Sequence, residues 1–105
     1  MLKAEQTDEY RRWFARLRDV PGKTSIVRQI QRIVEAGEYV GDWKNVGGVI
    51  EVRIVGKGPG YRIYLSIEGQ TVLLLLVGGD KSSQQKDINK AKELLKEWRE
   101  SNANL

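Results

Sequence analysis

The sequence predicts a single α+β domain in which two helices precede a small antiparallel sheet and one helix follows it. Up to about residue 37 the apolar residues recur at spacings of three and four, which is typical of a buried helix face. Between residues 49 and 67 they alternate with polar residues, as in strands that bury one face. A chain of 105 residues has room for one hydrophobic core, so residues 1–105 are interpreted as one domain.

The N-terminal part predicts a short edge strand followed by a helix. Residues 1–6 fit an edge strand that adds to the sheet. Thr7 is suited to cap the helix, because its hydroxyl can accept a hydrogen bond from a free N–H of the first turn. The apolar face of this helix carries large side chains at spacings of four and three: Tyr10, Phe14 and Leu17.

A second helix is predicted after the helix-breaking sequence DVPG at residues 19–22. Three isoleucines form its apolar stripe: Ile26, Ile30 and Ile33. Gly37 stands where the end of a helix favours a residue with positive φ. The two consecutive helices are expected to form a hairpin.

Three strands are predicted as a meander at residues 49–55, 61–67 and 71–77. A glycine-rich turn at residues 56–60 joins the first two. The third strand contains four successive leucines, so it is apolar on both faces. Such a strand is usually central and covered from both sides.

The last helix is predicted after a loop at residues 78–83. Ser82 and Gln85 have the spacing of a capping box at its start. The apolar stripe of this helix consists of Ile88, Ala91, Leu95 and Trp98.

Strand alternation sorts the side chains of the first two strands onto two faces, whatever their register. The apolar face consists of Ile50, Val52, Ile54, Ile63, Leu65 and Ile67. The polar face consists of Glu51, Arg53, Arg62, Tyr64 and Ser66. Two arginines and a tyrosine suit a phosphodiester backbone, since a guanidinium group can give a phosphate two hydrogen bonds. The alternative is an ordinary solvated sheet face with a cross-strand ion pair.

Two glycine-rich loops are candidates for holding an anion. The loop at residues 56–60 joins two strands, so it matches neither a P-loop nor a dinucleotide motif and is interpreted as a hairpin turn. The loop at residues 78–81 runs from a strand towards a helix, so its N–H groups can face an anion. Lys81 adds a cation at the same end of the sheet.

Composition excludes several classes of function. The absence of cysteine and histidine excludes a disulfide framework, a thiol nucleophile and the usual catalytic triad. The aspartates lack a convincing ligand set, so neither a metal site nor a cofactor is predicted. The chain begins with polar residues, and its longest apolar run is far shorter than the ~20 residues of a membrane helix. A cytoplasmic protein is therefore expected, and its net charge of +4 is compatible with a polyanionic partner.

Four motifs occur in an order that resembles one protein family. They are LRD at residues 17–19, VIEVRI at 49–54, GPGYRIY at 58–64 and GGDKSSQQKDI at 78–88. Together they resemble the RelE/ParE toxin superfamily, specifically the HigB-like branch of addiction module killer proteins. The resemblance implies a RelE-like fold: two N-terminal helices, a small curved antiparallel sheet and a C-terminal helix.

The resemblance also implies a function. Such proteins are toxins of type II toxin–antitoxin systems that cut messenger RNA without a metal ion, commonly on the ribosome, and so inhibit translation. The implied partners are the message, the ribosome and a cognate antitoxin, usually a HigA-like helix-turn-helix protein, through which the complex binds operator DNA. No membrane partner is expected, because the longest apolar run is too short for a membrane helix. The alternative within the superfamily is a ParE-like protein that inhibits DNA gyrase or another protein target without catalysis.

The resemblance assigns roles to individual residues of this chain. The implied catalytic residues are Arg62, Lys81, Arg53 and Tyr64. The implied RNA-binding residues are Glu51, Lys57, Tyr61, Gln84 and Gln85. The C-terminal catalytic tyrosine of RelE-type enzymes has no counterpart here, which leaves the proton-transfer groups open. Because Arg62 falls on the polar face, its removal is expected to open no cavity in the core.

Overall fold

The computed structural model describes residues 1–56 and 58–103, and these form the predicted α+β domain. The helices are α1 (Asp8–Arg16), α2 (Val20–Ala36) and α3 (Gln84–Ser101), with a short 3-10 turn, η1 (Lys81–Ser83), before α3. The strands are β1 (Lys3–Gln6), β2 (Trp43–Asn45), β3 (Ile50–Arg53), β4 (Arg62–Glu68) and β5 (Val72–Gly79). Among the helices of the described ranges, none is long and apolar enough to cross a membrane.

The five strands form one mixed sheet in the order β1-β5-β4-β3-β2. The meander β3-β4-β5 is antiparallel, as predicted, and β1 is an edge strand. The prediction of a wholly antiparallel sheet is wrong, because β1 runs parallel to β5 with Lys3 beside Val72. Strand β2 was not expected, since its three residues are all exposed and too few for an alternating pattern.

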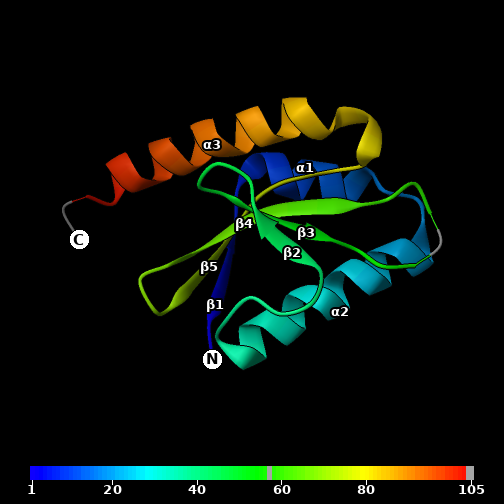
Figure 1. The fold of residues 1–105 in the computed structure, drawn as a ribbon, viewed down its shortest axis with the longest axis horizontal. Coiled ribbons are helices and arrows are strands. Elements are labelled where there is room, and N and C mark those ends of the chain that lie inside the picture. The colour runs from blue at the N-terminus through cyan, green and yellow to red at the C-terminus, as the bar shows by residue number, and fades with distance from the viewer. Residues whose placement is uncertain (57, 104–105) are drawn as a thin grey trace.

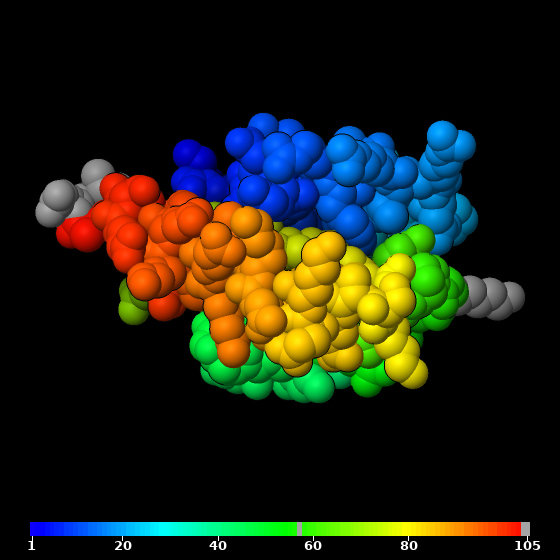
Figure 2. All heavy atoms as spheres, turned by 90° about the horizontal axis from the view of Figure 1, so that it is seen from above, coloured from blue at the N-terminus to red at the C-terminus, as the bar shows by residue number. Residues whose placement is uncertain are grey.

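Helices cover both faces of the sheet (Figure 1). One core lies between the sheet and the helices α1 and α2, and includes Tyr10, Ile26 and Ile63. A second core lies between the sheet and α3, and includes Leu74 and Ala91. The view in Figure 2 shows α3 running along the length of the molecule with α1 beside it. Glu51 of β3 and Arg62, Tyr64 and Ser66 of β4 are therefore buried on this side of the sheet, whereas Arg53 at the end of β3 stays exposed.

Strand β5 lies inside the sheet, between β1 and β4, and is buried on both sides, as its leucine run predicts. Its pairing with β4 shifts by one residue, since Tyr64 lies opposite Val77 whereas Leu65 lies opposite Leu75. Leu76 is the additional residue, as in a β-bulge. Its carbonyl oxygen accepts a hydrogen bond of 2.6 Å from the Thr7 hydroxyl. The bulge therefore binds the start of α1.

Two glycines at the end of β5 allow helices to pack directly on the strand. A Cβ atom on Gly78 would overlap the indole ring of Trp13 from α1. A Cβ atom on Gly79 would overlap the carboxylate of Asp87 from α3. Successive residues of a strand point to opposite faces, so each glycine accommodates one helix.

The predicted start of α1 and the predicted end of α2 are confirmed, whereas the starts of α2 and α3 differ. Residues 20–22 were expected to precede α2 but form its first turn, because Asp19 caps the helix by accepting a hydrogen bond from Gly22 N and a proline is tolerated in the first turn. The Thr7 hydroxyl accepts a hydrogen bond from Tyr10 N, and Gly37 ends α2 with a φ of 73°. The predicted capping box of Ser82 and Gln85 is wrong. Ser82 lies in η1, where its backbone N–H donates to the side chain of Asp80, so α3 begins two residues later.

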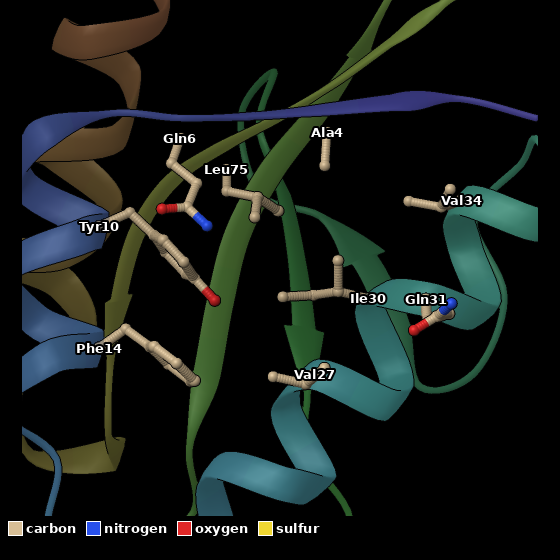
Figure 3. Close-up of a pocket in the computed structure, with 9 residues that line it drawn as sticks. All are labelled: Ala4, Gln6, Tyr10, Phe14, Val27, Ile30, Gln31, Val34 and Leu75. Carbon is tan, nitrogen blue, oxygen red and sulfur yellow. The ribbon is translucent and has the colours of Figure 1, made fainter.

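Helices α1 and α2 lie on one face of the sheet and leave an apolar groove between them (Figure 3). They approach each other where the Lys23 ammonium lies 4.7 Å from the centre of the Phe14 ring. Farther along, a cavity of about 240 Å³ is bounded by Tyr10 and Phe14 from α1 and by Val27 and Ile30 from α2. The two helices of the predicted hairpin are thus present but splayed.

Candidate functional site

Four of the residues predicted to act on RNA line one hollow of about 380 Å³. These are Arg53, Tyr61, Arg62 and Lys81. They come from the end of β3, the start of β4 and the first residue of η1. The structure therefore brings together three of the predicted cations and one of the predicted tyrosines.

The sheet register explains why the three cations meet. Arg53 and Arg62 lie opposite each other in the pairing of β3 with β4. Arg62 lies opposite Gly79 in the pairing of β4 with β5. Lys81 follows Gly79 by two residues, so all three cations lie at the same end of the sheet. Gly60 has a φ of 75°, a conformation that L side chains rarely adopt, and it brings the chain back into β4 at this point.

Arg62 is the most firmly held of the three cations. Its Nη1 donates a hydrogen bond of 2.9 Å to the carbonyl oxygen of Gly60, and its Nε lies 3.8 Å from Oε1 of Glu51. Only 7% of the residue is exposed. Arg62 does lie on the predicted polar face, but the expectation that its removal opens no cavity is wrong, because α3 covers this side of the sheet and the side chain is buried. Removing the side chain would take away one of the two cations, Arg62 and Lys44, that lie within 4 Å of the buried Glu51 carboxylate.

Glu51 is the centre of a buried polar cluster. Its side chain is fully buried, and its Oε2 accepts hydrogen bonds from the Tyr64 hydroxyl at 3.1 Å and from Gln84 Nε2 at 2.9 Å. The ammonium of Lys44 lies 3.7 Å from its Oε1 at the rim of the cluster. Glu51, Tyr64, Gln84 and Arg62 are hereafter the Glu51 cluster.

Two members of the Glu51 cluster cannot contact RNA directly. Glu51 and Tyr64 both have 0% exposed surface, so the prediction that they face a ligand is wrong. Burial, together with the neighbouring Glu51 carboxylate, raises the pKa of Tyr64 well above its ordinary value. Tyr64 therefore stays protonated and acts as a hydrogen-bond donor to Glu51.

Tyr61 belongs to the hollow and binds an aspartate behind it. Its hydroxyl donates a hydrogen bond of 2.9 Å to Oδ2 of Asp19, the residue that caps α2. Burial and this hydrogen bond raise the pKa of Tyr61. The phenol is therefore protonated at neutral pH and can serve as a donor but not as a base.

Arg53 and Lys81 are the exposed cations of the hollow. The Nε of Arg53 lies 3.8 Å from Oδ2 of Asp42, and both side chains are about half exposed. Lys81 follows Asp80, whose side chain accepts a hydrogen bond of 2.8 Å from Ser82 N. Hydrogen bonds from Ser82 hold the pKa of Asp80 below its ordinary value. Both cations can move towards a ligand without uncovering the core.

The other predicted RNA-binding residues lie outside the hollow. Gln84 belongs to the Glu51 cluster, and Gln85 donates a hydrogen bond of 3.0 Å to Asn89 on the exposed side of α3. Lys57 lies outside the described residues. Sequence reasoning missed Asp42, a carboxylate that lines the hollow, because no motif marks the loop before β2.

Metal-binding residues do not cluster in the part of the chain that the structure describes. Across residues 1–56 and 58–103, no group of three aspartates or glutamates is placed to hold a metal ion. The hollow itself is lined by four charged residues, of which one is acidic: Asp42, Arg53, Arg62 and Lys81.

A relative from Haemophilus influenzae shares nearly the whole of this domain. That protein, named "Uncharacterized protein", is 38% identical over 97 residues, which cover 91% of this chain and 95% of its own length. This chain belongs to its family. No protein-family model matches the chain, and no solved structure does either. The name of the Haemophilus relative states no activity, so the chemistry of the family has to be inferred from the residues of the hollow.

Proposed function

We propose that this protein is a type II toxin of the RelE/ParE superfamily, in its HigB-like branch, and that it cuts translated messenger RNA at the ribosome. The observation that carries the proposal is the hollow itself. Arg53, Arg62 and Lys81 converge there beside the hydroxyl-bearing ring of Tyr61. Three cations around one opening can neutralise a phosphodiester and the extra charge that develops when it is attacked.

The proposed reaction is attack of a ribose 2′-oxygen on the adjacent phosphorus. The new P–O bond forms in line with the bond to the 5′-oxygen, which breaks, leaving a 2′,3′-cyclic phosphate and a 5′-hydroxyl. The 2′-hydroxyl loses a proton and the leaving 5′-oxygen gains one. Asp42 is the lining carboxylate that can accept the first proton, and Lys81 can donate the second.

Arg62 and the two exposed cations have different parts in this proposal. The hydrogen bond to Gly60 and the buried Glu51 carboxylate fix the Arg62 guanidinium before a substrate arrives. A cation that is fixed in advance needs no reorganisation in the transition state. Arg53 and Lys81 are exposed, and they can close over the phosphate once it is bound.

The test is primer extension on a translated message after expression of the chain. Lys81→Ala and Arg53→Ala are compared with Lys96→Ala on α3 and Arg16→Ala on α1, two exposed cations outside the hollow. We expect wild type and both controls to produce new 5′ ends. Each hollow variant should cut about 10²–10³ times more slowly, the usual cost of losing one group that stabilises transition-state charge.

Two outcomes would contradict the proposal. Hollow variants that cut at the wild-type rate would exclude this site. An intact message together with altered plasmid supercoiling would instead support a ParE-like inhibitor of DNA gyrase. Melting curves by circular dichroism, recorded for every variant, separate loss of activity from loss of fold.

The proposed function includes a protein partner, a cognate antitoxin of HigA-like, helix-turn-helix type that also carries the complex to operator DNA. The +4 net charge supports an electrostatic contribution to that complex. Titration of the purified pair at low and high salt measures it. An affinity that does not fall with salt would exclude the charged surface as the main antitoxin contact.

A further inference from the structure

A second hollow adjoins the first along the end of β3. It has a volume of about 230 Å³ and lies between α2 and the segment 53–55. Four residues line both hollows: Asp42, Arg53, Ile54 and Val55. The two hollows are therefore halves of one trough, with Arg53 at the junction.

The second hollow adds two cations to the trough. Arg28 and Arg32 are one helical turn apart on α2, are both exposed, and both line it. The Nη1 of Arg32 donates a hydrogen bond of 3.1 Å to Oε1 of Gln29, and Nε2 of Gln29 donates one of 2.7 Å to the carbonyl oxygen of Val40. Gln29 thus links the arginine to the loop that closes the hollow.

The same loop is held close to α2. Gly41 has a φ of 90°, and a Cβ atom there would overlap the amide of Gln29. The next residue, Asp42, pairs with Arg53 at the junction of the hollows. The Arg53 backbone N–H also donates a hydrogen bond of 2.9 Å to the carbonyl oxygen of Asp42, so the backbone at Arg53 is held close to α2, from which Arg28 and Arg32 extend.

We infer that an RNA strand bound in the first hollow continues through the second, where Arg28 and Arg32 bind phosphates that flank the one to be cut. The inference rests on the proposed function. Five cations then line one trough, with Lys81 and Arg62 in the first hollow, Arg53 at the junction, and Arg28 and Arg32 in the second. Spaced cations suit a polymer that carries one charge per nucleotide.

The wall between the hollows suits a nucleotide as well. Val55 is 80% exposed, and it lines both hollows together with Ile54 and Arg53. An apolar side chain next to cations offers a contact for the face of a base or ribose while the phosphate is bound. Without a bound nucleotide, most of the Val55 side chain is exposed to water.

The experiment measures binding of two non-cleavable RNA probes by fluorescence anisotropy at several salt concentrations. Both carry 2′-O-methyl groups, which remove the nucleophile. One is a dinucleotide that fills only the first hollow, and the other is a strand of about ten nucleotides, within the range that a single-strand groove accommodates. The variant is Arg28→Ala/Arg32→Ala, and the matched control is Arg11→Ala/Arg12→Ala on the exposed side of α1.

We expect Arg28→Ala/Arg32→Ala to bind the long probe about tenfold more weakly and the dinucleotide as wild type does. In a plot of log affinity for the long probe against log salt concentration, the slope for this variant should be shallower by about 1.4 than for the wild type. That difference corresponds to the loss of two phosphate contacts at ~0.7 each. The control should match the wild type with both probes. Alanine is favourable in an exposed helix position, so both double variants are expected to fold.

The outcomes separate this inference from the proposed function. Equal slopes and affinities for the two double variants would overturn the path along α2. A wild-type chain that cuts translated message but binds neither probe would overturn the path and leave the nuclease standing. A wild-type chain that neither cuts message nor binds either probe would reject both.

Discussion

The Nε atom of Arg62 lies 3.8 Å from Oε1 of Glu51, and among the described residues neither atom has a hydrogen-bond partner. The distance is too long for a hydrogen bond, so the two groups attract each other by charge alone. The other carboxylate oxygen receives both hydrogen bonds of the Glu51 cluster. Glu51 therefore acts on Arg62 as a fixed negative charge behind the guanidinium.

Glu51→Gln is predicted to destabilise the fold. The amide oxygen of glutamine can still accept from Tyr64 and Gln84, but the buried Arg62 loses its compensating charge. Breaking a buried ion pair by removing one partner typically costs about 3 kcal/mol of unfolding free energy. Denaturant titration of wild type and variant measures the loss.

A double-mutant cycle tests the cause of that loss. In Glu51→Gln/Arg62→Gln both charges are gone, so the double variant should lose less than the sum of the two single variants. Strict additivity would mean that the two side chains act independently of each other.

Arg62→Lys is predicted to fold and to lose activity. The ammonium keeps a positive charge near Glu51, so the carboxylate stays compensated. An ammonium is a point charge, and it cannot donate to Gly60 and present a planar fork to a phosphate at the same time. We expect a fall of about 10²-fold in message cleavage with little change in melting temperature. Cleavage at the wild-type rate would show that the fork is not needed.

The ion pair between Glu68 and Arg99 predicts a pH dependence of stability. Arg99 Nε and Nη2 donate hydrogen bonds of 2.6 and 3.0 Å to the Glu68 carboxylate, joining β4 to the end of α3. These bonds from Arg99, helped by one from Ser66, hold the pKa of Glu68 below its ordinary value of 4.5. The folded state therefore binds a proton less readily than the unfolded state does.

The stability that Glu68 contributes is therefore complete above the unfolded pKa and is lost as the pH falls through the lower folded pKa. The difference in unfolding free energy between wild type and Glu68→Gln should be constant at neutral pH and narrow below about pH 5. Glu35→Gln, an exposed carboxylate on α2, is the control. A difference that widens on acidification would contradict the assignment.

Gly78→Ala is predicted to destabilise the domain through α1. The added methyl group would overlap the Trp13 ring, and overpacking of this kind costs about 1–3 kcal/mol. Thermal unfolding of the variant measures the cost. Trp13→Leu in the same chain should recover part of it, because the smaller side chain leaves room. A Gly78→Ala protein as stable as wild type would mean that Trp13 does not pack on β5 in solution.

Periodicity and local chemistry were enough to predict most of the fold. Thr7 and Gly37 mark helix ends by their own side-chain and backbone properties, and the leucines of β5 indicate burial on both faces. The direction of β1 could not be predicted, because it depends on hydrogen bonds to residues about 70 positions away. Strand β2 was missed for a similar reason, since only its pairing with β3 defines it.

The candidate site was predicted in part. Alternation correctly places Glu51, Arg53, Arg62 and Tyr64 on one face, and the register confirms that parity. The alternation of side chains shows which residues share a face of the sheet, but it does not show whether a helix covers that face. The polar residues of α3 near Gln84 do not indicate that this helix lies over Glu51, so alternation alone predicts an open face where the structure has a covered one. Arg53 and Lys81 stay exposed because they lie at the ends of their elements.

The parallel pairing of β1 with β5 affects the order in which the domain folds. Lys3 pairs beside Val72, and Thr7 donates to the carbonyl of Leu76, so the first strand has no partner until the fifth is made. Contacts between such distant segments carry a large loop-closure entropy and slow the folding of a small domain. A nascent chain must therefore keep its first residues undocked until most of the polypeptide has been synthesised. The sheet, and with it the close packing of α1 on Gly78, can be completed only after β5 has been made.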